Sequence, residues 1–141
     1  MHTHTQVTFW QVANNQEKLA TVCRLAHIHF ARAERILIVA PNEAATHYLD
    51  QLLWTSPAES FLPHTVSVHP IAAAVVITTV LQNLNQAKIL MNLCPVASAF
   101  AKEFREVHEL LDKTDPSKYQ LSKDRHHAYQ TWGLDLRVES V

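Results

Sequence analysis

Apolar residues recur along this chain with two different periods, and the alternation between them predicts strands and helices in turn. Gln6 to Val12 is rich in β-branched and aromatic residues, which favour an opening strand. Asn14, with Glu17 three residues later, marks the start of a helix. The continuous apolar run Ile36 to Val39 predicts a strand that is covered on both faces. Strands and helices in this order predict a parallel sheet with right-handed crossovers.

The segment Tyr48 to His64 begins as a helix with one apolar face and ends in a stiff corner. Ser56-Pro57 ends the helix, because proline cannot continue it. Trp54, Phe61 and Pro63 then bring large rings and proline close together. Two interpretations are open: the rings fill the core of the protein itself, or they project and pack against another protein.

The second half of the chain contains further strands and one long helix. Ala72 to Val80 is rich in Val, Ile and Thr and predicts a strand, although its alanines leave a helix open. Lys88 to Leu93 predicts another strand, and Arg105 to Leu111 is either a strand or the continuation of a short helix before it. Ser117 to Trp132 has no Gly or Pro and precedes Gly133, the expected residue after a helix end.

Length and composition narrow the fold class. The 141 residues suit one domain spanning the whole chain, 1–141. Because phosphate-binding loops need several glycines and the chain has only Gly133, such a loop is close to excluded. We expect a three-layer α/β fold, in which a mostly parallel sheet carries helices on both faces, with a Rossmann-like topology that lacks a nucleotide-binding loop.

Charge and reactive residues point away from catalysis. Twelve Lys and Arg balance thirteen Asp and Glu, which disfavours direct, tight binding of nucleic acid. Two cysteines suit reduced thiols, and the ten histidines lack the spacing of a metal site. No apolar run is long enough to cross a membrane. We expect a soluble, cytoplasmic protein with no cofactor, no metal and no independent catalysis.

One face of the long C-terminal helix carries a candidate binding site. Tyr119, Lys123, His126 and Gln130 recur at intervals of four, three and four, so they share a face. One ammonium, one imidazole and one aromatic ring can hold an acidic peptide, but a plain solvated helix has the same pattern. We expect the buried side of this helix to contain Leu121, Ala128 and Trp132.

Two blocks of the sequence resemble a known family. The run LDxxLWxxPAESFxPH at positions 49–64, and the run KDRHHAY at 123–129 followed by GLDL at 133–136, are similar to segments of the chi subunit of bacterial DNA polymerase III. This clamp-loader accessory protein is a bacterial, cytoplasmic adaptor in DNA replication. The resemblance implies that polymerase activity belongs to the holoenzyme and that the chain bridges the psi subunit of the clamp loader to single-stranded DNA-binding protein.

The resemblance also implies roles for particular residues. Lys123 falls where the family has the basic residue that holds the terminal carboxylate of the acidic tail of single-stranded DNA-binding protein, and His126 falls where the family has tyrosine. Lysine lacks the forked donors of arginine, and histidine can become charged near neutral pH, so tail binding should depend more on salt and pH. Tyr119 completes this site, and Arg125 could replace Lys123 if the helix is rotated.

The corner after the central helix is implied to dock psi, with Phe61 as the main anchor and Trp54 and Pro63 beside it. Two alternatives remain for the whole chain. One is a small nucleotide- or phosphate-handling α/β enzyme, since this fold class hosts many such enzymes. The other is an adaptor of the same shape that serves a repair helicase.

Overall fold

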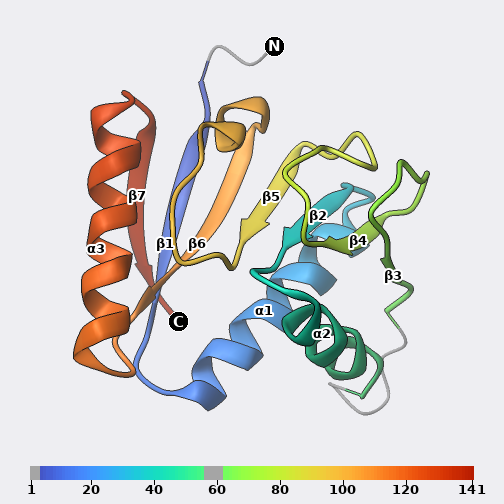
Figure 1. Cartoon of the computed structure of the whole chain (residues 1–141), viewed down its shortest axis with the longest axis horizontal. Helices are drawn as coiled ribbons and strands as arrows, with labels where there is room; N and C mark the ends of the chain where they lie inside the picture. Colours follow the sequence, from blue (N-terminus) through green and yellow to red (C-terminus); the bar gives the residue numbers. More distant parts are fainter. Residues whose placement is uncertain (1–3, 56–61) are drawn as a thin grey trace.

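The computed structural model describes residues 4–55 and 62–141, and its centre is a sheet of seven parallel strands in the order β3-β4-β2-β5-β6-β1-β7 (Figure 1). The strands are β1 (Gln6–Val12), β2 (Ile36–Val39), β3 (Thr65–Val66), β4 (Val75–Thr78), β5 (Ile89–Asn92), β6 (Glu106–Asp112) and β7 (Asp135–Ser140). The helices are α1 (Asn15–Ala31), α2 (Glu43–Thr55), the short 3₁₀ helix η1 (Ala99–Glu103) and α3 (Pro116–Thr131).

Two hydrophobic cores lie on the two faces of the sheet. One contains Leu25 of α1 and Leu53 of α2, and the other contains Phe100 of η1 and Tyr129 of α3. Neighbouring residues of β2 alternate between these cores, because successive side chains of a strand point to opposite faces. The prediction of a three-layer α/β fold with a parallel sheet is therefore confirmed (Figure 1).

The continuous apolar runs became central strands. All residues of β2, β4 and β5 are buried, as expected for strands that are covered on both faces. The strand interpretation of Ala72 to Val80 holds, with β4 occupying Val75–Thr78. Arg105 to Leu111, which the sequence left open, forms β6 and not a continued helix.

Local signals set the helix ends. The side chain of Asn14 accepts a hydrogen bond from the Glu17 amide at 2.8 Å, while Glu17 Oε1 accepts one from the Ala13 amide at 2.8 Å. Asp115 caps α3 in the same way through the Lys118 amide at 2.8 Å. Gly133 follows α3 with a φ of +79°, a conformation that glycine adopts without a Cβ penalty.

The chain changes direction across the sheet between β2 and β5. From β2 it continues through α2 to β3 and β4 on one side, whereas from β5 it continues to β6 and β7 on the other. Since all strands are parallel, their carboxyl ends share one edge, and such a reversal opens a crevice at that edge. Among the described residues, no helix combines the length and the apolar character that crossing a membrane requires.

Candidate functional site

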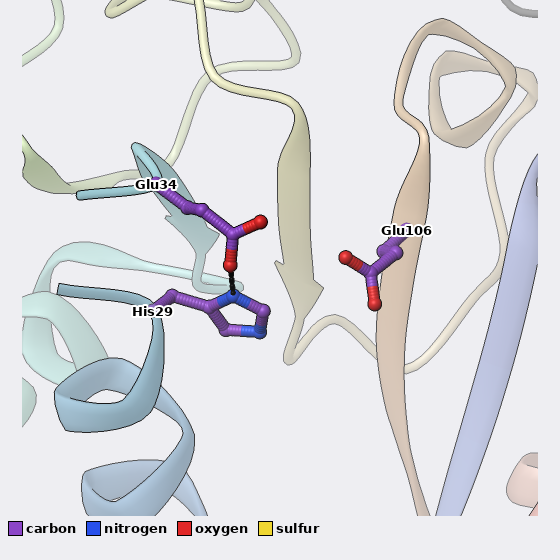
Figure 2. A group of neighbouring side chains, drawn as sticks. All are labelled: His29, Glu34 and Glu106. Atoms are coloured by element: carbon purple, nitrogen blue, oxygen red, sulfur yellow. Dashed lines mark hydrogen bonds and ion pairs between the residues drawn. The ribbon is translucent and has the colours of Figure 1, made fainter. Parts of the chain in front are cut away.

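Three side chains with metal-binding atoms meet at the amino-terminal edge of the sheet. One ligand atom from each of His29, Glu34 and Glu106 lies within 4.8 Å of the others (Figure 2). The guanidinium of Arg105, however, donates to Glu34 Oε2 at 2.6 Å and to Glu106 Oε2 at 3.2 Å. The hydrogen bond with His29, and then that with Arg105, lower the pKa of Glu34 against the effect of its burial. A metal ion would have to displace a cation that two carboxylates hold, so we interpret this cluster as an ion-pair network.

A chain of hydrogen bonds connects this cluster to the interior and determines the tautomers of two histidines. Trp10 Nε1 donates to His108 Nδ1 at 3.1 Å, so neutral His108 carries its proton on Nε2. That nitrogen lies 2.8 Å from His29 Nε2, which must therefore accept. His29 then donates from Nδ1 to Glu34 Oε1 at 2.9 Å. Burial, reinforced by the nearby His29, lowers the pKa of His108 to about 3.

The outward side of α3 brings cations onto an aromatic ring. Lys123 Nζ lies 4.6 Å from the centre of the Tyr119 ring, and Lys113 Nζ lies 5.7 Å from it. His126, by contrast, packs its ring against the buried Phe9 of β1, with ring centres 5.1 Å apart, and so points toward the sheet. Within the described part of the chain, no carboxylate forms an ion pair with Lys113 or Lys123. The structure thus adds Lys113, which precedes the helix and was not visible from helical spacing.

The buried side of α3 differs from the side that the sequence predicted. Leu121 is 36% exposed and Ala128 is only partly buried, so their assignment to the buried side is wrong, whereas Trp132 is partly buried and does pack against the core. Tyr129 and Ser122 are fully buried, and Arg125 is nearly so. These three lie at helical spacing, but two of them are polar, and their burial depends on partners in other elements.

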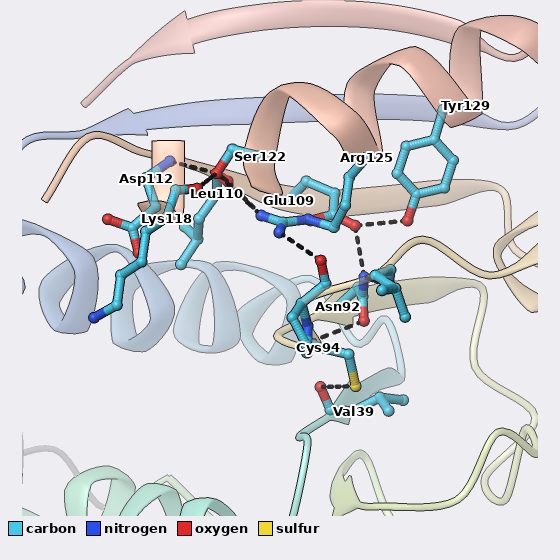
Figure 3. Close-up of polar contacts among 12 residues, drawn as sticks. Val39, Asn92, Cys94, Glu109, Leu110, Asp112, Lys118, Ser122, Arg125 and Tyr129 are labelled. Atoms are coloured by element: carbon cyan, nitrogen blue, oxygen red, sulfur yellow. Dashed lines mark hydrogen bonds and ion pairs between the residues drawn. The ribbon is translucent and has the colours of Figure 1, made fainter. Parts of the chain in front are cut away.

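Glu109 of β6 supplies those partners in a buried network (Figure 3). Glu109 Oε1 accepts from Arg125 Nε at 2.9 Å, and Oε2 accepts from Tyr129 Oη at 2.6 Å and from Asn92 Nδ2 at 2.7 Å. Arg125 also donates to the carbonyl oxygens of Pro95 at 3.1 Å and Leu110 at 3.0 Å. Burial raises the pKa of Glu109, and the charge of Arg125 opposes this most strongly.

Arg125 is therefore committed to the interior and does not share the outward face with Lys123. Its guanidinium is paired with Glu109, and its side chain is nearly buried. We correct the suggestion that Arg125 could take the place of Lys123, because moving it outward would leave Glu109 without its charge partner in the core.

A histidine packs against the end of α2. Trp54 is 45% exposed at the end of α2, and its ring centre lies 4.3 Å from that of His64. His64 is buried, with Nδ1 2.7 Å from the Leu62 carbonyl oxygen and Nε2 3.0 Å from Asp50 Oδ1. Pro63, which precedes His64 in the sequence, is exposed. Phe61, the anchor predicted from the sequence, lies outside the described residues.

Comparison with known proteins gives one consistent family. A family model described as "DNA polymerase III chi subunit, HolC" matches residues 4–137. The DNA polymerase III subunit chi of Escherichia coli is 33% identical over 120 residues, which cover 83% of this chain and 81% of that protein. The DNA polymerase III subunit chi of Pseudomonas aeruginosa is 27% identical over 135 residues, which cover 94% of each chain.

A solved structure resembles the fold at a much lower sequence identity. The crystal structure of T4 UvsW aligns with a TM-score of 0.65 at 7% identity, covering 97% of this chain and 41% of that one. At this identity the likeness supports the α/β architecture alone.

Proposed function

Because this chain belongs to the DNA polymerase III chi subunit family, we propose that it joins the clamp loader, through psi, to single-stranded DNA-binding protein during DNA replication. The observation that carries the proposal is the outward face of α3, where Lys113 and Lys123, which form no ion pair with any described carboxylate, lie over the Tyr119 ring. In this proposal the chain is a cytoplasmic adaptor, and polymerase activity belongs to the holoenzyme.

The acidic tail of single-stranded DNA-binding protein would lie along this face. Lys123 would attract its terminal carboxylate as a point charge, since an ammonium has no forked donor geometry. Tyr119 would supply apolar contact to a neighbouring side chain of the tail. Lys113, which also donates to Gln11 at 2.8 Å, would add a second positive charge for the upstream carboxylates.

His126 remains part of this proposal from the sequence. Its ring packs against Phe9 of β1, with ring centres 5.1 Å apart.

The second proposed contact, with psi, would use the Trp54 corner. Trp54 keeps nearly half of its surface exposed although the His64 ring packs against it, and Pro63, next to His64 in the sequence, is exposed as well. A rigid, partly exposed indole loses little conformational entropy when a partner covers it. Phe61 remains part of this proposal from the sequence.

The two surfaces lie on different parts of the molecule, which a bridging function needs. In Figure 1, α3 flanks the sheet beside β7 and β1, whereas α2 lies near β2 and β4. Binding at one surface therefore leaves the other accessible. Two weak contacts joined by one rigid body would reinforce each other through effective concentration.

A titration with the tail peptide of single-stranded DNA-binding protein tests the proposal. Lys123→Glu should weaken peptide binding by about tenfold or more, because it replaces attraction with repulsion. Lys88→Glu is the matched control, since it makes the same charge change at an exposed site at the start of β5. Equal affinities for the two variants would show that the tail does not bind at this face of α3.

A further inference from the structure

A cavity of about 440 Å³ lies at the carboxyl edge of the sheet, where the chain changes direction. Its walls come from α1, α2 and α3, and its floor from the ends of β2, β5 and β6. Ligands of open α/β sheets bind in this kind of crevice, and their pockets usually measure roughly 300 to 1,000 Å³. Position and size are therefore those of a small-molecule site.

The cavity is mainly apolar inside. Large aliphatic side chains from five elements or their ends line it: Leu19, Val22, Leu49, Leu93, Leu110 and Leu121. Tyr48 is 52% exposed, although it also lines the cavity. A floor of this kind favours an apolar ligand body and gives no cradle for a nucleotide phosphate.

The polar groups of the cavity carry a surplus of positive charge. Lys18 Nζ lies 2.6 Å from Asp112 Oδ2, so these two charges offset each other. The charge of Arg125 is offset by Glu109 behind the wall. Lys118, by contrast, is exposed and has no carboxylate partner in the part of the chain that the structure describes (Figure 3).

We propose that this cavity binds a small amphipathic anion, a molecule with an apolar body and one carboxylate or similar group. The apolar body would lie among the leucines, and the anionic group would point to Lys118. Among the described residues that line the cavity, Lys118 is the one cation that has no carboxylate partner. The cavity uses a different side of α3 from the proposed tail site, since Lys118 and Leu121 line it whereas Tyr119 and Lys123 do not. The proposal does not depend on the function proposed above.

Calorimetric titration with octanoate, and with octylammonium as its opposite-charge counterpart, tests the proposal. Octanoate should bind with one-to-one stoichiometry, and octylammonium should bind at least about fivefold more weakly. Lys118→Glu should weaken octanoate binding by about fivefold to tenfold, whereas Lys88→Glu, far from the cavity, should leave it unchanged.

A filling variant tests the location independently of charge. Ala45→Phe places a ring in the cavity and should abolish octanoate binding, whereas Ala44→Phe adds the same ring to an exposed position on α2 outside it. Circular dichroism checks that both variants fold. If Ala45→Phe does not fold, the comparison of Lys118→Glu with Lys88→Glu tests the proposal instead.

Three results would overturn the proposal. The first is equal affinity for octanoate and octylammonium, and the second is equal loss of binding in the two lysine variants or in the two phenylalanine variants. The third is sedimentation showing that a second copy of the chain covers the cavity and excludes octanoate.

Discussion

Lowering the pH from about 7 to 5 should destabilise this protein through His108, a side chain on β6 that is only 6% exposed. Its pKa falls from the ordinary 6.5 to about 3 in the folded protein, mainly because burial disfavours the charged ring. The hydrogen bonds agree, because His108 accepts from Trp10 at 3.1 Å and faces His29 at 2.8 Å, so an added proton would break one of these contacts.

The direction of this pH effect depends on which state, folded or unfolded, binds the proton at His108. Below about pH 6.5 the unfolded chain takes up a proton at this histidine, while the folded protein does not until the pH approaches 3. The unfolded state is therefore favoured progressively as the pH falls from about 6.5 toward 3. The stability that depends on neutral His108 is fully present above about pH 6.5. Integration between pH 7 and pH 5 gives a loss of about 2 kcal/mol in the free energy of unfolding.

Urea denaturation at several pH values measures this loss. Between about pH 7 and 5, wild type should lose about 2 kcal/mol more than His108→Gln, which has no group to titrate at this position. His69→Gln, which removes an exposed histidine, should lose about as much free energy of unfolding between pH 7 and 5 as wild type. The ring resonances of His108 should also keep their neutral form down to about pH 4.

Parallel pH profiles for wild type and His108→Gln would refute this reasoning. So would ring resonances that titrate near pH 6.5, the ordinary value, since the folded protein would then accept the proton without loss. Either result would mean that the hydrogen-bond chain from Trp10 to Glu34 does not persist in solution.

Further predictions concern the buried network and the two proposed surfaces. Glu109→Ala should lower the free energy of unfolding by about 3 to 5 kcal/mol in urea denaturation, because Arg125 would keep a buried charge without its partner. Glu103→Ala, at an exposed position, should change it by less than about 0.5 kcal/mol. Trp54→Ala should reduce co-purification with psi without changing the melting temperature of the protein. Tyr48→Ala, which removes a similarly exposed aromatic ring from α2, should not reduce co-purification.

Local sequence signals determined most of the architecture. The continuous apolar runs of β2 and β5 need two covered faces, and this requirement, together with the alternation of strands and helices, predicts a layered α/β fold. Asn14 and Gly133 mark helix ends because their effect depends on the backbone of the next few residues. The spacing of Tyr119 and Lys123 likewise predicted their contact, since side chains four residues apart on a helix are neighbours.

Tertiary structure decided everything that depends on partners distant in the sequence. Periodicity assigned the buried side of α3 to apolar residues, but Glu109 on β6 makes burial of Arg125 and Tyr129 favourable instead. The pairing of His29 with His108 spans 79 positions, and no local pattern announces it. The cavity exists only because the strand order brings β2 and β5 together where the chain reverses. Strand order depends on long-range packing, which a single sequence does not display as a local pattern.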